Sequence, residues 1–144
     1  MKTIIIPTQF QNRISEMLKE YSVVYLAAYA GMGKTSVVRE YLKKRKIGYT
    51  YVQAEDDDFF ECLATAGEGV VVIDDFQDIS QENEEYLKAN FHKLLRKHRF
   101  VILSRAFMPA WMKPYQIIGQ LGSLDNSVLI FYSKRTRISD ADFC

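Results

Sequence analysis

The sequence predicts an α/β fold in which helices cover both faces of a mostly parallel, five-stranded sheet. Short apolar runs, typical of strands buried on both faces, alternate along the chain with longer segments whose apolar residues recur at helical spacing. The 144 residues are 48% hydrophobic and 26% charged, a composition that suits one domain with one core, here residues 1–144. The alternation implies a three-layer sandwich with right-handed crossovers.

The first half of the chain contains two predicted helices and two predicted strands. Apolar residues at i, i+4, i+7 and i+8 indicate a helix over residues 8–20, and the almost wholly apolar residues 22–27 indicate a buried strand. A glycine-bearing turn follows. Helical spacing then resumes from 34 to about 44, and the β-rich residues 49–52 form the next expected strand.

An acidic segment precedes the next elements. Carboxylates at 55–58 complement the positive end of a helix dipole, so a short helix is expected to start there and to end at Gly67. Residues 69–73 are the most β-branched run of the chain and predict a central strand. This strand ends abruptly in Asp74-Asp75.

The last third has a weaker pattern. A long amphipathic helix is expected over 81–97, followed by a buried strand over 100–103 that ends in Ser104-Arg105. Pro109 and Pro114 bracket a single short helix, and residues 128–132 predict the last strand. The loop after residue 27, the acids after residue 73 and Ser104-Arg105 thus all follow carboxyl ends of strands, where ligands bind in such sheets.

Bulk properties exclude several classes of function. A formal charge of +1 gives no broad field for nucleic acid or an acidic membrane, and the run at 43–46 is favoured as a solvated helix end. Cys62 and Cys144 lack metal-ligand spacing, which indicates reduced thiols, and His92 and His98 are expected to be surface residues of the long helix. No run of about eighteen apolar residues exists. We expect a cytoplasmic protein without membrane or direct DNA contact.

Residues 28–35 read Ala-Tyr-Ala-Gly-Met-Gly-Lys-Thr and fit the phosphate-loop pattern, with Ala28 in place of the usual first glycine. Glycines let successive N–H groups turn inward around an anion, and the following helix adds its positive end. Lys34 would reach the β- and γ-phosphates, the Thr35 hydroxyl would ligate Mg²⁺, and Ser36 would add an α-phosphate contact. The residues expected around the phosphates are Ala28, Ala30, Gly31, Met32, Gly33, Lys34, Thr35 and Ser36.

The residues argue against two other interpretations of this loop. A dinucleotide fingerprint fails because its third glycine position holds Ser36. A GTPase would need an Asn-Lys-x-Asp element, which the chain lacks. An ordinary glycine turn beside an exposed Lys34 remains as the simple alternative.

The acids and the arginine complete the candidate site. Asp74 stands where a carboxylate can meet the Mg²⁺ held by Thr35, and Asp75 would point toward the attacking water. The alternative for both acids is a helix N-cap. Arg105 could contact the γ-phosphate as a bidentate cation, or could be a surface arginine paired with a loop acid.

Together these pieces resemble the ATPase domain of the signal-transduction ATPases with numerous domains, in the maltose-regulon-activator group of LuxR-type transcriptional regulators. The resemblance implies Lys34 and Thr35 as phosphate and magnesium contacts, Asp74 as the magnesium carboxylate, Asp75 as the water-orienting acid and Arg105 as the γ-phosphate sensor. It also implies that the strand over 100–103 lies between the other two functional strands. The motifs that carry it are Ala30-Gly31-Met32-Gly33-Lys34-Thr35, Glu55-Asp56-Asp57-Asp58-Phe59, Val72-Ile73-Asp74-Asp75-Phe76 and Leu103-Ser104-Arg105.

The resemblance implies an ATP- and Mg²⁺-binding switch ATPase whose partners are ATP or ADP, other domains of the same regulator, or a second copy. Family members continue into lid, sensor and DNA-binding regions beyond the point that Cys144 reaches, so we expect a part of a larger regulator with slow hydrolysis at best. Two alternatives stay open. A small P-loop kinase would need a cation-rich lid, but residues 106–122 offer only Lys113. A non-catalytic interaction module would keep the loop as scaffold.

Overall fold

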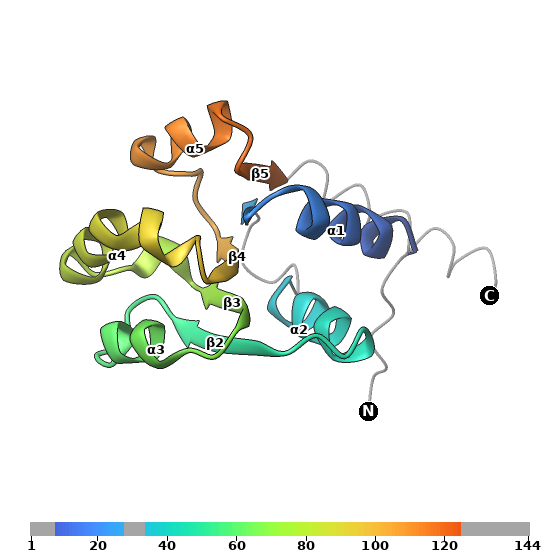
Figure 1. The fold of residues 1–144 in the computed structure, drawn as a ribbon, viewed down its shortest axis with the longest axis horizontal. Coiled ribbons are helices and arrows are strands. Elements are labelled where there is room, and N and C mark those ends of the chain that lie inside the picture. The colour runs from blue at the N-terminus through green and yellow to red at the C-terminus, as the bar shows by residue number, and fades with distance from the viewer. Residues whose placement is uncertain (1–7, 28–33, 125–144) are drawn as a thin grey trace.

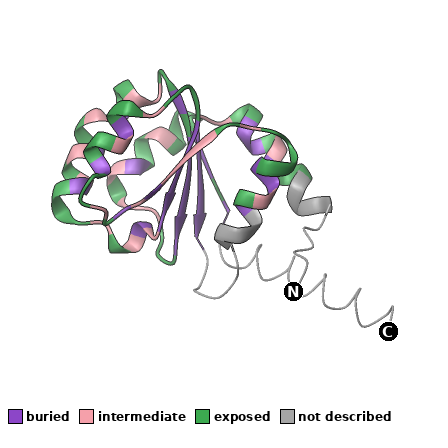
Figure 2. Ribbon diagram, turned by 90° about the horizontal axis from the view of Figure 1, so that it is seen from below, coloured by how far each residue is buried: buried purple, intermediate pink, exposed green. Residues whose placement is uncertain are grey.

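The computed structural model describes residues 8–27 and 34–124, and it confirms the predicted fold class. Five parallel strands form one sheet in the order β2-β3-β4-β1-β5, with helices on both faces (Figures 1 and 2). The strands are β1 (Val23–Ala27), β2 (Tyr49–Gln53), β3 (Gly69–Asp74), β4 (His98–Ser104) and β5 (Leu121–Leu124). The helices are α1 (Thr8–Glu20), α2 (Lys34–Lys44), α3 (Phe59–Thr65), α4 (Gln81–Leu94) and α5 (Lys113–Ile117), with short 3-10 helices η1 (Phe76–Asp78) and η2 (Ala110–Met112).

Each face of the sheet has its own core, because alternate residues of a strand point to opposite faces. Val70 and Val72 of β3 belong to the core beneath α1 and α2. Val71 and Ile73 belong to the core that contains α3 and α4 side chains. The strands in the middle of the sheet are buried on both sides (Figure 2). By the same alternation, Asp74 lies on the face that α2 covers.

Most of the expected elements are where the sequence placed them. The helices over 8–20 and 34–44 have the predicted bounds, and the strands predicted over 22–27, 49–52, 69–73 and 100–103 all form. The strand containing residues 100–103 lies between β3 and β1, as the family resemblance implied.

The end of the long helix was predicted wrongly. α4 stops at Leu94, and the amides of Arg96 and Lys97 bond to carbonyls three residues back, which tightens and closes the helix. His98 therefore starts β4 opposite Gly69 and is only 6% exposed, whereas the sequence placed it on the surface of the helix. The continuous apolar run of β4 begins only at Phe100 and could not reveal this, because a histidine two residues earlier is equally compatible with a helix end.

The C-terminal third also differs from expectation. The fifth strand is Leu121–Leu124, paired with β1, and was not predicted because Gly122 and Ser123 have poor strand propensity. The strand predicted over 128–132 lies outside the described residues. The short helix expected before Pro114 is η2 followed by α5, since proline is compatible with the first turn of a helix.

Replacing Gly69, the first residue of β3, is expected to destabilise the fold. Its φ is +125°, and a Cβ there would lie 2.8 Å from the carbonyl oxygen of Gly48 on the neighbouring segment. Gly69→Ala should therefore lower the free energy of unfolding by about 1–3 kcal/mol in denaturant titrations. Gly67→Ala is the matched control, because its Cβ would meet nothing within 4 Å. Equal losses in the two variants would contradict this account.

Candidate nucleotide-binding site

The predicted polar clusters follow strands that end at one edge of the sheet. Ala27 at the end of β1 is in register with Ser104 at the end of β4, and Ile73 of β3 is in register with Ile102 of β4. β4 therefore lies between β1 and β3, one strand spacing of about 4.8 Å from each. The strand ends that precede the three sequence clusters lie at the same edge of the sheet.

The phosphate-loop motif is flanked by the strand and helix it requires. β1 ends at Ala27 and α2 begins at Lys34, with Thr35 and Ser36 in its first turn. The predicted contacts Ala28, Ala30, Gly31, Met32 and Gly33 lie outside the described residues. The amino end of α2 leaves backbone N–H groups without partners in the helix, a feature that suits an anion.

Asp74 is buried at the end of β3, and the residue is only 5% exposed. Among its partners, the Tyr51 hydroxyl donates a hydrogen bond to Oδ2 at 2.5 Å, and the backbone N–H of Asp75 donates one to Oδ1 at 2.8 Å. Asp75 occupies the N-cap position of η1, but its side chain makes no capping hydrogen bond. Asp75 instead has a left-handed backbone, with φ of 52°.

Tyr51 links Asp74 to α2. The guanidinium carbon of Arg39 lies 4.6 Å from the centre of the Tyr51 ring, and Arg39 Nε donates to the hydroxyl of Tyr49 at 3.3 Å. Burial first, and then the hydrogen bond to Asp74, raise the pKa of Tyr51 to about 12. The phenol therefore stays a protonated donor to Asp74 across the neutral range. Sequence reasoning missed Tyr51; the signal available was its position on the α2 side of a strand neighbouring β3.

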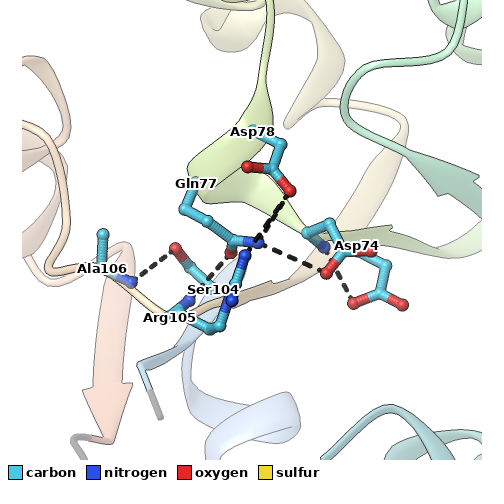
Figure 3. A network of polar contacts seen from close by, with 7 residues as sticks. Asp74, Gln77, Asp78, Ser104, Arg105 and Ala106 are labelled. Atoms are coloured by element: carbon cyan, nitrogen blue, oxygen red, sulfur yellow. Dashed lines mark hydrogen bonds and ion pairs between the residues drawn. The ribbon is translucent and has the colours of Figure 1, made fainter. Parts of the chain in front are cut away.

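A polar network joins the ends of β3 and β4 (Figure 3). Gln77 is its centre: its Oε1 accepts from the backbone N–H of Arg105 at 2.9 Å, and its Nε2 donates to Asp75 Oδ1 at 3.4 Å and to Asp78 Oδ2 at 3.1 Å. The Asp75 carboxylate and the Arg105 segment are thus tied through one amide side chain. Gln77 and Asp78 were not predicted, because nothing in the residue pattern marks η1 as part of a site.

Arg105 pairs with a loop acid in this structure. Its guanidinium nitrogen lies 3.8 Å from Asp78 Oδ2, and both side chains are nearly half exposed. This is the arrangement described by the simpler of the two interpretations of Arg105, while its part in contacting a γ-phosphate stays a prediction. Ser104 is fully buried, accepts a hydrogen bond from the Ala106 N–H at 3.0 Å, and lies on the face opposite to Asp74 (Figure 3).

The oxygen donors at this edge fit a magnesium ion that arrives with a nucleotide. Mg²⁺ prefers carboxylate and hydroxyl oxygens and is usually held by one or two carboxylates together with phosphates of the substrate. Asp74 supplies a carboxylate on the α2 side, and Thr35 is the second residue of that helix. Across residues 8–27 and 34–124, no three His, Cys, Asp or Glu side chains cluster as a self-sufficient metal site.

Comparisons with solved structures identify the fold. The P-loop NTPase domain of the sigma-54 transport activator from E. coli matches with a TM-score of 0.52 at 14% identity, over 85% of this chain and 97% of that one. The Thermotoga maritima RuvB Holliday junction branch migration motor matches with a TM-score of 0.60 at 14% identity, over 83% of this chain and 45% of the RuvB chain. AMPPCP-bound DnaA from Aquifex aeolicus matches with a TM-score of 0.54 at 16% identity, over 95% of this chain and 53% of the DnaA chain. This chain has a P-loop NTPase-like fold.

These likenesses show the fold alone, since identity is at most 16%. No protein-family model and no curated protein matches the sequence. This chain spans about half the length of the RuvB and DnaA chains. Within the described part of the chain, no helix has the length and apolar character needed to cross a membrane.

Tyr25 should make the stability of this domain sensitive to alkaline pH. It is 1% exposed and donates to the Ala106 carbonyl at 2.9 Å; burial raises its pKa above the usual value near 10, although the Ser104 hydroxyl opposes the shift. A raised folded-state pKa means that this contribution is complete below pH 10 and is lost as pH rises further. Tyr25→Phe should lower the free energy of unfolding by about 1 kcal/mol at neutral pH. In denaturant titrations above pH 10, the free energy of unfolding of the variant should fall less steeply with pH than that of wild type. Parallel pH profiles of the two proteins would contradict this expectation.

Proposed function

We propose that this domain binds ATP with Mg²⁺ and serves as the nucleotide-dependent switch of a larger cytoplasmic transcriptional regulator, with slow hydrolysis. The observation that carries the proposal is the placement of a buried carboxylate, Asp74, on the face covered by α2, at the sheet edge where the phosphate-loop motif runs from β1 into that helix. A cation bound beside this carboxylate would be attracted more strongly than in open water, because little solvent screens the charge of a buried group.

Each predicted residue has a role in this proposal. Lys34 and the first-turn amides of α2 bind the β- and γ-phosphates, and Thr35 and Asp74 hold the metal. Asp75 orients the attacking water, and Arg105 contacts the γ-phosphate after leaving Asp78. Ser36 would add a contact to the α-phosphate, and Ala28, Ala30, Gly31, Met32 and Gly33 would contribute backbone N–H groups to the phosphates. The bound Mg²⁺ would neutralise charge that develops on the phosphate oxygens.

Two further observations support nucleotide binding and the switch role. DnaA, which shares this fold, was captured with AMPPCP, an ATP analogue. Gln77 ties Asp75 to the segment that carries Arg105, so a phosphate that draws Arg105 away from Asp78 would also disturb the acid. Such a coupled change is what a regulator with other domains, or a second copy, could read as its nucleotide signal.

Calorimetric titration with ATP, ADP, AMP and GTP, each in Mg²⁺ and again in EDTA, tests the proposal. We expect ATP and ADP to bind with Mg²⁺, AMP to bind far more weakly because it lacks the β-phosphate, and EDTA to weaken the binding of ATP. Preference for ATP over GTP is expected from the family resemblance. Equal binding of AMP and ATP would contradict a site built for polyphosphate.

Asp75→Asn should separate hydrolysis from binding. The amide keeps the size of the side chain and its contact with Gln77 but cannot accept a proton from water. We expect the affinity for Mg-ATP to stay within about twofold while the single-turnover hydrolysis rate falls at least about tenfold. An unchanged rate would remove Asp75 from the reaction and would favour the interpretation as a non-catalytic interaction module.

A further inference from the structure

We infer that Tyr51 is a positioning residue for Asp74, and that Arg39 of α2 holds Tyr51 in place, so that the metal-facing carboxylate is set by the same helix that begins the phosphate site. The inference rests on the proposed role of Asp74 in binding Mg²⁺. It concerns how tightly the metal is held, which the phosphate-loop residues alone do not decide.

The placement follows from the register of β2 and β3. Gln53 stands opposite Asp74, and Tyr51 stands opposite Val72, so Tyr51 is the diagonal neighbour of Asp74 on the same face of the sheet. Diagonal neighbours lie about 7–8 Å apart between backbones, a gap that the length of a tyrosine spans. Its hydroxyl meets Asp74 Oδ2 at 2.5 Å, the distance of a charge-assisted hydrogen bond.

The two donors at Asp74 restrict the rotation of its carboxylate. The torsion that turns a carboxylate is soft, so an aspartate without fixed partners presents its oxygens in many directions. Here Tyr51 fixes Oδ2 and the backbone N–H of Asp75 fixes Oδ1. Both donors are neutral, so the negative charge that attracts Mg²⁺ is kept, whereas an arginine or lysine in place of Tyr51 would cancel it.

Arg39 carries the link to α2. Its guanidinium lies 4.6 Å from the centre of the Tyr51 ring, and its Nε bonds to the hydroxyl of Tyr49, so it contacts two side chains on one face of β2. Arg39 comes about one and a half turns after Lys34 in the same helix. A movement of the start of α2 on phosphate binding would therefore be passed to Tyr51, and through it to the Asp74 carboxylate.

The test compares Tyr51→Phe with Tyr49→Phe. Tyr51→Phe keeps the ring under Arg39 and removes only the donor to Asp74; Tyr49→Phe removes a hydroxyl from the same face of the same strand but not one that touches Asp74. For each variant, ATP affinity is measured in EDTA and across a Mg²⁺ titration. Partners of a metal-ligating group typically contribute 10–100-fold to metal affinity. We expect about tenfold more Mg²⁺ to be needed for Tyr51→Phe. Tyr49→Phe leaves the hydrogen bond to Asp74 in place and removes only the anchor of Arg39, so its Mg²⁺ requirement should rise by no more than about threefold, the factor expected when Arg39 itself is replaced. Affinity in EDTA should be unchanged in both variants.

Arg39→Gln is a second, exposed variant that keeps the fold and should raise the Mg²⁺ requirement by a smaller factor, about threefold, since it loosens Tyr51 without removing its hydroxyl. Wild-type Mg²⁺ dependence in both Tyr51→Phe and Arg39→Gln would overturn the inference while leaving the proposed function intact. If the wild-type protein itself bound no ATP, or bound it without regard to Mg²⁺, the proposed function would fail first.

Discussion

Lys34→Ala is expected to weaken binding of Mg-ATP about 100-fold. Lys34 is the first residue of α2, directly after the glycine-rich segment, so its ammonium group would meet the β- and γ-phosphates at the positive end of the helix. A hydrogen bond between charged groups contributes up to about 3 kcal/mol, which corresponds to roughly two powers of ten in Kd. Titration calorimetry of both proteins gives the comparison directly.

Lys43→Ala is the matched control for this variant. Lys43 lies in the last turn of the same helix, is exposed, and is at the opposite end of the sheet from the candidate site. It removes the same charge from the protein, so a general electrostatic effect would appear equally in both variants. We expect the affinity of Lys43→Ala to match wild type. If Lys34→Ala bound Mg-ATP as tightly as wild type, the glycine segment would be better interpreted as an ordinary turn beside an exposed lysine.

Phe91→Ala is expected to cause the largest loss of stability, about 3–5 kcal/mol in the free energy of unfolding. Phe91 of α4 is fully buried and is the hub of an aromatic cluster. Its ring centre lies 5.5 Å from that of Phe100, 5.4 Å from Trp111 and 5.1 Å from Tyr115. Truncation would leave a cavity between the sheet, α4 and α5 that rigid aromatic neighbours cannot close. Denaturant titration at neutral pH measures the loss.

Phe60→Ala provides the comparison for this core variant. Phe60 stacks on Tyr86 with ring centres 4.2 Å apart, but it is 40% exposed on α3. Its truncation removes an aromatic pair without opening a buried cavity, so about 1 kcal/mol is expected. Losses of similar size for Phe60 and Phe91 would mean that the cluster around α4 is not the core of this face.

The sequence was sufficient for the parallel sheet because β1, β3 and β4 are almost wholly apolar and are buried on both faces. It was not sufficient for β5, where Gly122 and Ser123 form a strand only through pairing with β1. Local propensity is weak there, and the strand is stabilised by a neighbour about a hundred residues earlier.

The candidate site shows the same division. That Asp74 and Ser104 follow neighbouring strands could be anticipated, because apolar runs that end in polar residues mark the carboxyl edge of such a sheet. The contacts that link these strand ends could not be anticipated from the sequence. Gln77 lies in a 3-10 turn without a periodic pattern, and the Tyr51 contact depends on which strand neighbours β3 and in which register. These are pairings in space, which spacing along the chain does not encode.

The most direct test of the central claim is a crystal structure of the protein with Mg²⁺ and a non-hydrolysable ATP analogue. We expect the phosphates at the amino end of α2, against Lys34, with Mg²⁺ about 2.0–2.1 Å from the Thr35 hydroxyl and facing Asp74 directly or through one water. A nucleotide found away from the start of α2, or a metal on the face of the sheet opposite to Asp74, would contradict the account.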